Sequence, residues 1–172
     1  VTIGGNGFFS GWAWNDIVGW ISFNCDNSGT AGCDPGSGGS DYKVKTSWQA
    51  TATIAYLISA VFDTQMMGGA APNAILWQGT QPTGTSVKFQ ISSSNCSNGA
   101  TNPPACNSGT WSYLGLNGTE FDYYETGPDT PIKINLAFHN NQRYFRYKVI
   151  LVSDFEQKNS PKVGDVIINW SP

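Results

Sequence analysis

Three tryptophans surround a short polar break in the segment Gly11-Trp12-Ala13-Trp14-Asn15-Asp16-Ile17-Val18-Gly19-Trp20-Ile21-Ser22-Phe23-Asn24-Cys25. Side chains alternate between two faces along an extended strand, so Trp12 and Trp14 share one face. Asn15-Asp16 has the residue types of a turn, and the run from Trp20 to Phe23 returns as a second aromatic-rich strand. The segment therefore predicts a tryptophan-rich β-hairpin.

Apolar and polar residues alternate most cleanly in two later runs, Ser86–Ser92 and Arg143–Val152. In each run every second side chain is expected to face a core, and these are Val87, Phe89 and Ile91 in the first and Phe145, Tyr147, Val149 and Leu151 in the second. The polar side chains between them are expected to face solvent, namely Lys88, Gln90, Arg146 and Lys148. Both runs therefore predict half-buried strands.

Shorter apolar or alternating runs occupy much of the remaining chain, at Ile54–Phe62, Ala74–Trp77, Trp111–Leu114, Ile132–Phe138 and Val163–Trp170. Turn signals such as Asn117-Gly118 recur about every ten residues, and no window shows helical periodicity over three turns. This spacing is typical of antiparallel sandwiches and jelly rolls. We therefore predict an all-β fold, an antiparallel β-sandwich or jelly roll with an N-terminal tryptophan-rich β-hairpin module.

Two domains are expected, a hairpin module over residues 1–50 and a β-sandwich domain over residues 51–172. The module continues through a glycine-rich stretch to Asp41–Lys45, an alternating run that predicts a strand. Only 12% of the residues are charged and the net charge is −3, which argues against binding to nucleic acid. The sequence contains no apolar run long enough to span a membrane, so no membrane contact by this segment is expected. Val1 is not a natural start, and an upstream export or anchoring segment is expected.

The four cysteines form two local pairs, Cys25 with Cys33 and Cys96 with Cys106, and each pair brackets a loop rich in small polar residues. Four cysteines allow three connectivities, and proximity along the chain favours these two disulfides. A zinc site is the competing interpretation, but the chain has no C-x-x-C motif and one histidine. We predict two disulfides, no metal, and an oxidising compartment outside the cytoplasm. An alternative calcium site among Asp26, Asn27 and Asp34 is less favoured because such residues are common in loops.

The segment that begins Gly11-Trp12-Ala13-Trp14 and continues with Gly19-Trp20-Ile21-Ser22-Phe23-Asn24-Cys25 resembles a GWAW…GWISFNC motif of bacterial cell-surface and pilin-like proteins. Residues 57–172 resemble a β-sandwich domain of bacterial surface proteins, many of which carry a prepilin-type N-terminal helix. The matching segments are Ser59–Thr64, Leu76–Gln90, Arg143–Lys148 and Ser160–Pro172. This resemblance implies an extracellular or cell-surface location. The hydrophobic first helix of a pilin is not part of this chain.

Catalytic chemistry finds little support in the sequence. His139 is the only histidine and lies in the polar stretch His139-Asn140-Asn141-Gln142, where an exposed turn residue is expected. Glu120, Asp122 and Glu125 lie close together, as paired carboxylates of a glycosidase would, but solvated surface positions are the simpler interpretation. No nucleophile elbow, phosphate loop or zinc-protease helix is present. We therefore expect a protein that is not an enzyme and needs no cofactor.

Aromatic side chains are the best candidates for contacts with a ligand or another subunit, and these are Trp12, Trp14, Trp20, Tyr123 and Tyr124. The leading hypothesis is a self-associating structural subunit of a bacterial surface appendage or filament. Unpaired strand edges, such as one within Val1–Phe9, invite a strand from a neighbouring copy. The alternative is a monomeric adhesive module that binds surface glycans through stacked aromatic rings. The expected partner is thus a second copy of the chain or a glycan.

Overall fold

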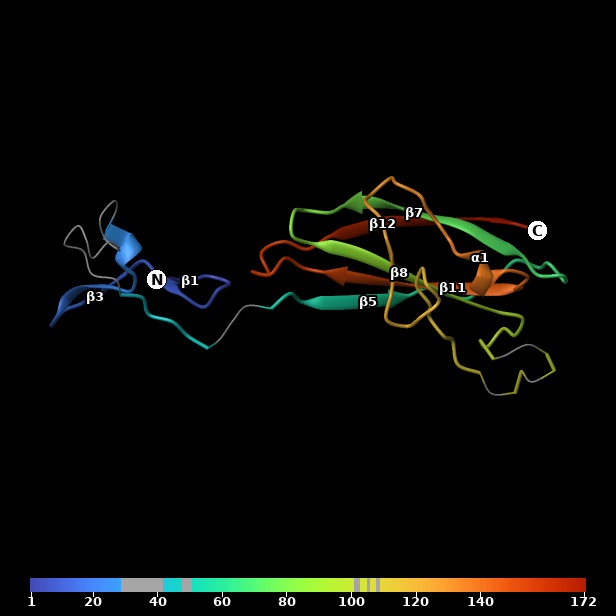
Figure 1. Cartoon of the computed structure of the whole chain (residues 1–172), viewed down its shortest axis with the longest axis horizontal. Helices are drawn as coiled ribbons and strands as arrows, with labels where there is room; N and C mark the ends of the chain where they lie inside the picture. Colours follow the sequence, from blue (N-terminus) through green and yellow to red (C-terminus); the bar gives the residue numbers. More distant parts are fainter. Residues whose placement is uncertain (29–41, 48–50, 101–102, 105, 108) are drawn as a thin grey trace. The chain divides into compact units, whose positions relative to one another are not determined.

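The computed structural model of the chain describes residues 1–28, 42–47, 51–100, 103–104, 106–107 and 109–172 (Figure 1). It is 45% strand and 5% helix with antiparallel sheets, so the predicted all-β class is confirmed. The chain divides into two compact units. The first comprises Val1–Ala52 with Phe155–Lys158, and the second comprises Thr53–Asp154 with Asn159–Pro172. Among the described residues, no helix is long and apolar enough to cross a membrane.

The first unit contains two small antiparallel sheets. Strand β1 (Thr2–Ile3) pairs with β2 (Phe9–Ser10), and β3 (Trp12–Asn15) pairs with β4 (Gly19–Ser22). A 3₁₀ turn, η1 (Cys25–Ser28), follows the second sheet. The pairing of β3 with β4 is the predicted tryptophan hairpin.

Side-chain amides tie the loops of this first unit to its backbone. The Asn27 side chain accepts a hydrogen bond from the Gly11 amide at 2.9 Å and donates one to the Gly11 carbonyl at 2.7 Å. Residues Tyr42–Lys45 make isolated bridges, Asn24 with Lys43 and Phe8 with Lys45, rather than the continuous strand expected there. Asp41, the first residue of that expected strand, lies outside the described residues.

The second unit is built from two facing sheets (Figure 1). The five-stranded sheet has the order β5 (Ile54–Ile58), β11 (Tyr144–Val152), β8 (Ser86–Ser94), β9 (Tyr124–Glu125), and β6 (Phe62–Asp63) also pairs with β11. The three-stranded sheet has the order β10 (Ile132–Lys133), β7 (Ala71–Thr80), β12 (Lys162–Ser171). The predicted antiparallel β-sandwich is thus present.

The core of the sandwich is formed by the inward faces of both sheets. Its buried members are Ile75, Trp77, Val87, Phe89, Ile91, Tyr124, Ile134 and Val149, and Tyr147 and Leu151 pack against it. The indole Nε1 of Trp77 donates to the Thr126 carbonyl at 2.9 Å, so burial leaves no unpaired polar atom on that ring. The inward faces predicted for the two cleanest alternating runs are therefore confirmed.

Gln90 departs from the expected alternation because a loop covers the outer side of the sheet at this point. Its side chain is 1% exposed, whereas the alternation predicted a solvent-facing residue. The amide Nε2 donates to the carbonyls of Glu120 and Asp122, at 2.9 and 3.1 Å. Period-two patterning reports which face a residue takes, and it does not report whether a distant loop covers that face.

Two expected strand boundaries also move. The run Ile132–Phe138 is a strand only over β10, and it continues into a short helix, α1 (Leu136–His139). The helix begins here because the Asn135 side chain caps it by accepting a hydrogen bond from the Ala137 amide at 3.1 Å. Strand β7 is longer than the expected run Ala74–Trp77 and includes Pro72. A register shift between Asn169 and Trp170 lies opposite Pro72, and a bulge of this kind lets a strand contain proline.

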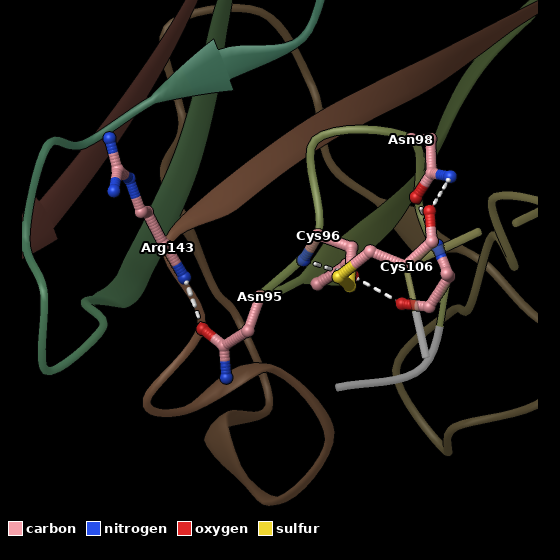
Figure 2. Close-up of a disulfide and its surroundings, with 7 residues drawn as sticks. Asn95, Cys96, Asn98, Cys106 and Arg143 are labelled. Atoms are coloured by element: carbon pink, nitrogen blue, oxygen red, sulfur yellow. Dashed lines mark hydrogen bonds between the residues drawn. A yellow bond between two sulfur atoms is a disulfide. The ribbon is translucent and has the colours of Figure 1, made fainter. Parts of the chain in front are cut away.

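The disulfide between Cys96 and Cys106 closes a loop that follows β8 (Figure 2). Cys96 is 2% exposed, and its amide donates to Ser94 Oγ at 2.9 Å. Asn98 Nδ2 donates to the Cys106 carbonyl at 2.7 Å, which adds a hydrogen bond across the loop. One of the two predicted disulfides is thereby confirmed. Cys25 is buried and also disulfide-bonded, but its predicted partner Cys33 lies outside the described residues.

Candidate functional site

The loop between β3 and β4 is fixed by one asparagine and one glycine. Asn15 and Gly19 are paired, which leaves a three-residue loop. Asn15 Oδ1 accepts hydrogen bonds from the amides of Ile17 and Val18, at 2.9 and 3.2 Å. Gly19 has φ of +79°, the left-handed conformation that ends a three-residue hairpin loop of this kind. The turn expected at Asn15-Asp16 is therefore present, and its loop consists of the three residues between Asn15 and Gly19.

Pairing across the hairpin collects the three tryptophans on one face. Trp14 lies opposite Trp20, and Trp12 lies two positions from Trp14 on the same strand. Directly opposed residues and residues two apart share a face of a sheet. The side chains of Trp12, Trp14 and Trp20 are 44, 59 and 67% exposed, so this aromatic face is open within its own unit.

The Trp20 ring contacts the Trp14 ring and, together with Trp12, lines a hollow. The rings of Trp14 and Trp20 meet edge to face, with centroids 5.3 Å apart, and Trp14 Nε1 donates to Asp16 Oδ1 at 3.1 Å. These contacts hold the Trp14 ring in place. Trp12 and Trp20 line a hollow of 360 Å³. We call Trp12, Trp14 and Trp20 the aromatic face.

The tip of the hairpin adds two apolar side chains that were not among the contact residues predicted from the sequence. Ile17 and Val18 are 92 and 67% exposed. Their signal in the sequence is two β-branched residues directly after the turn residues, where polar residues are usual. A contiguous exposed apolar surface of this kind commonly marks an interaction site.

The two tyrosines proposed as contact residues have different surroundings. Tyr124 is fully buried in the sandwich core, where its hydroxyl accepts a hydrogen bond from the Asn135 amide at 3.1 Å. It is therefore a core residue rather than a surface contact, because its strand β9 pairs with the edge of β8. Tyr123 is partly exposed and lies under Lys88 Nζ, 5.1 Å from the ring centroid.

Two of the three carboxylates considered for glycosidase chemistry, Asp122 and Glu125, have structural contacts. Asp122 accepts hydrogen bonds from the amides of Asn117 and Thr119 and closes the Asn117-Gly118 turn. These bonds outweigh the effect of burial and hold the pKa of Asp122 below its ordinary value. Glu125 forms an ion pair with Lys88 at 2.9 Å. The segment around Glu120 and Asp122 is not a strand, so the two side chains do not share a strand face.

The sequence predicted an exposed turn position for His139, and this prediction is wrong because the residue is buried. It ends α1 and is 1% exposed, because that helix packs its last residue against β8. Its Nδ1 lies 2.9 Å from Ser93 Oγ. Burial lowers the pKa of His139 to about 4, so the imidazole is uncharged at neutral pH. The histidine is thus sealed from solvent, whereas its partner Ser93 is partly exposed.

Among the described residues, no group of three or more His, Cys, Asp or Glu side chains lies close enough together to hold a metal ion. Asn27, one of the residues considered for calcium, uses its side chain to hold Gly11. Asp34, another, lies outside the described part of the chain.

Comparison with known proteins adds no relative. No protein-family model matches the chain, and no curated protein and no solved structure is significantly similar to it. The resemblance to surface and pilin-like proteins therefore stays a prediction from the quoted motifs.

Proposed function

We propose that this chain is a non-catalytic, extracellular structural subunit that self-associates in a bacterial surface appendage or filament. The observation that carries the proposal is the aromatic face, three exposed tryptophans on one side of a two-stranded sheet. Tryptophan is enriched at protein interfaces because a large rigid ring buries much area and loses little conformational freedom. The Cys96–Cys106 disulfide supports an oxidising compartment.

The experiment compares two variants of the same hairpin. Trp12→Ser/Trp20→Ser removes two rings from the aromatic face, whereas Ile21→Ser changes a residue of the same strand on the opposite face, where Ile21 pairs with Ala13. Assembly is followed by light scattering over a concentration series and by negative-stain electron microscopy. An antibody raised against the chain locates it on the source cells.

We expect the parent chain and Ile21→Ser to form higher assemblies, the double tryptophan variant to form none, and the antibody to decorate surface appendages. Assembly that is equal in all three proteins would remove the aromatic face as the interface. A monomeric chain together with antibody label absent from any appendage would overturn the proposed function.

A second candidate, binding of surface glycans, is favoured by the hollow between Trp12 and Trp20. Its volume of 360 Å³ lies within the range of small-ligand sites, and the apolar C–H face of a pyranose ring packs well against an indole. Titration with soluble oligosaccharides would then quench tryptophan fluorescence in a saturable way, and Trp12→Ser/Trp20→Ser would abolish the effect. An unchanged spectrum with neutral and with acidic oligosaccharides contradicts this candidate.

A further inference from the structure

The edge strand β5 of the second unit is apolar on both of its faces and open to solvent. Ile54, Tyr56 and Ile58 point to one side of the sheet and are 65, 71 and 39% exposed. Leu57, on the other side, is 57% exposed although it points toward the facing sheet. Within the described part of the chain, β11 is the one strand that pairs with β5.

The hydrogen-bonding groups of this edge can be assigned from the register. The Ser59 amide donates to the Tyr147 carbonyl at 2.9 Å, and the Thr53 carbonyl accepts from the Ser153 amide at 2.9 Å. In an antiparallel ladder the hydrogen-bonded positions alternate, so the odd-numbered residues of β5 face β11. The amides and carbonyls of Ile54, Tyr56 and Ile58 therefore point away from the sheet, toward the free edge.

Natural edge strands usually carry a device that prevents pairing with another chain, such as a lysine, a proline or a bulge. Residues 51–61, Thr-Ala-Thr-Ile-Ala-Tyr-Leu-Ile-Ser-Ala-Val, contain no charged residue and no proline. The pairing of β5 with β11 runs without a register shift from Ile54 to Ile58. This edge is thus uncharged, regular and unprotected.

The sequence of β5 is complementary to itself in one antiparallel register. When Tyr56 lies opposite Tyr56 of a second copy, Ile54 lies opposite Ile58 and Ala55 lies opposite Leu57. The outward-pointing groups of Ile54, Tyr56 and Ile58 are then all hydrogen-bonded, because these residues fall at the hydrogen-bonded positions of the new ladder. On the core side, each exposed Leu57 meets a small Ala55, so a large side chain fills the space beside a small one.

We infer that β5 is a self-pairing edge, and that two copies of the chain join through antiparallel β5–β5 contacts about a two-fold axis at Tyr56. The two five-stranded sheets then form one continuous sheet across the axis, with the exposed apolar side chains of both edges covered. The inference rests on the proposed function in that its partner is a second copy of the chain. It concerns a different surface from the aromatic face, and a two-fold contact closes on itself. A filament would thus need the aromatic face, or another surface, as its second contact.

The test uses two variants that differ at one position. Ile54→Glu/Ile58→Glu places like charges opposite each other in the inferred register, whereas Ile54→Lys/Ile58→Glu places a lysine opposite a glutamate at both ends. Both variants carry the same change beside Lys148, the neighbour of Ile58 in β11, so intramolecular effects there are matched. Sedimentation velocity over a concentration series reports the dimer, and circular dichroism with thermal unfolding reports the fold of each monomer.

We expect the parent chain to show a reversible dimer, Ile54→Glu/Ile58→Glu to weaken it at least tenfold, and Ile54→Lys/Ile58→Glu to retain it with an affinity that falls as salt is added. A parent chain that is monomeric at every concentration overturns the inference. Equal affinities for the two variants overturn the register and with it the site. The Trp12→Ser/Trp20→Ser variant separates the two proposals, because it should still form the β5 dimer while it loses higher assembly.

Discussion

Leu57 lies directly opposite Val149 in the ladder between β5 and β11, yet Val149 is 5% exposed and Leu57 is 57% exposed. Both side chains point toward the facing sheet. That sheet has three strands against five, and it covers the middle of the larger sheet but not its β5 edge. A groove of 480 Å³ adjoins the segment that follows β5, and Phe62, Tyr147 and Ile168 help to line it. The sandwich is thus closed over Val149 of β11 and open over Leu57 of β5.

Val149→Ala and Leu57→Ala should therefore differ sharply in their effect on the monomer. Val149→Ala removes two buried methyl groups and leaves a cavity, and we expect a loss of about 2 kcal/mol in the free energy of unfolding. Leu57→Ala trims a half-exposed side chain and should cost less than about 1 kcal/mol. Urea denaturation at low protein concentration, where the chain is monomeric, measures both values.

Equal losses for the two variants would mean that Leu57 is as well covered as Val149 in the monomer. A larger loss for Leu57→Ala at high protein concentration than at low concentration would instead report an interface that includes Leu57.

The hairpin that carries the aromatic face should depend on the backbone conformation of Gly19. A Cβ at this position would lie 3.7 Å from the nearest atom of Trp14, which is ordinary contact, so the cost of Gly19→Ala comes from φ of +79° alone. We expect about 1 kcal/mol of local destabilisation. The edge-to-face pair of Trp14 and Trp20 should give a far-ultraviolet exciton couplet in circular dichroism, and this signal should weaken in Gly19→Ala.

Gly68→Ala is the matched control, because a Cβ there has no atom within 4 Å and its backbone is outside the left-handed region. A couplet unchanged in Gly19→Ala, or lost equally in Gly68→Ala, would contradict the role assigned to the hairpin loop.

The strands were predictable from the sequence wherever burial of one face imposed strict alternation. The inward residues Val87, Phe89 and Ile91 of β8, and those of β11 from Phe145 to Leu151, follow from the pattern alone. The tryptophan hairpin was predictable for a related reason, since turn residues separate two short aromatic strands. The exposure of its tryptophans was not predictable, because aromatic residues occur both in cores and on surfaces. Trp77 is buried and Trp20 is exposed, and nothing local distinguishes them.

The predictions that were wrong concern residues whose surroundings depend on contacts with residues distant in sequence. Gln90 is buried because the Glu120–Asp122 backbone reaches it, and Tyr124 is in the core because its strand adds to the edge of β8. His139 occupies a polar stretch, but a capped helical turn points it inward. The exposed β5 edge was equally hidden in the sequence, because Ile54–Ile58 is as apolar as a central strand. Strand order decides such cases, and no pattern within one segment encodes strand order.

The Cys96–Cys106 disulfide should stabilise the second unit by a predictable amount. The two cysteines are 10 residues apart, and closing a loop of this length in the unfolded chain is worth about 2–3 kcal/mol. Cys96→Ser/Cys106→Ser should therefore lower the free energy of unfolding by about that amount, measured in urea without reductant. Ser94 Oγ, which bonds both the Cys96 amide and the Ala100 carbonyl, should keep the start of the loop in place. A variant as stable as the parent would show that these hydrogen bonds suffice.

His139 should make the second unit acid-sensitive at a pH where carboxylates are still ionised. Its pKa is about 4 in the folded chain because burial disfavours the charged ring, against 6.5 for an exposed histidine. Above pH 6.5 both states are neutral at this site, and stability does not change with pH. Between pH 6.5 and 4 the unfolded chain binds a proton that the folded chain does not, so stability falls by roughly 1.4 kcal/mol per pH unit, or about 3 kcal/mol in all.

His139→Gln should remove this slope while leaving the fold in place, as judged by circular dichroism at pH 7. Asp63 and Asp122 have lowered pKa values, so their contribution is lost only below their ordinary value of 3.8, outside the histidine window. For Asp63 the cause is the hydrogen-bonded ion pair with Arg143. Urea denaturation of the parent and of His139→Gln from pH 7 to 4 isolates the histidine. Parallel curves for the two proteins would place His139 in contact with solvent and contradict its burial against β8.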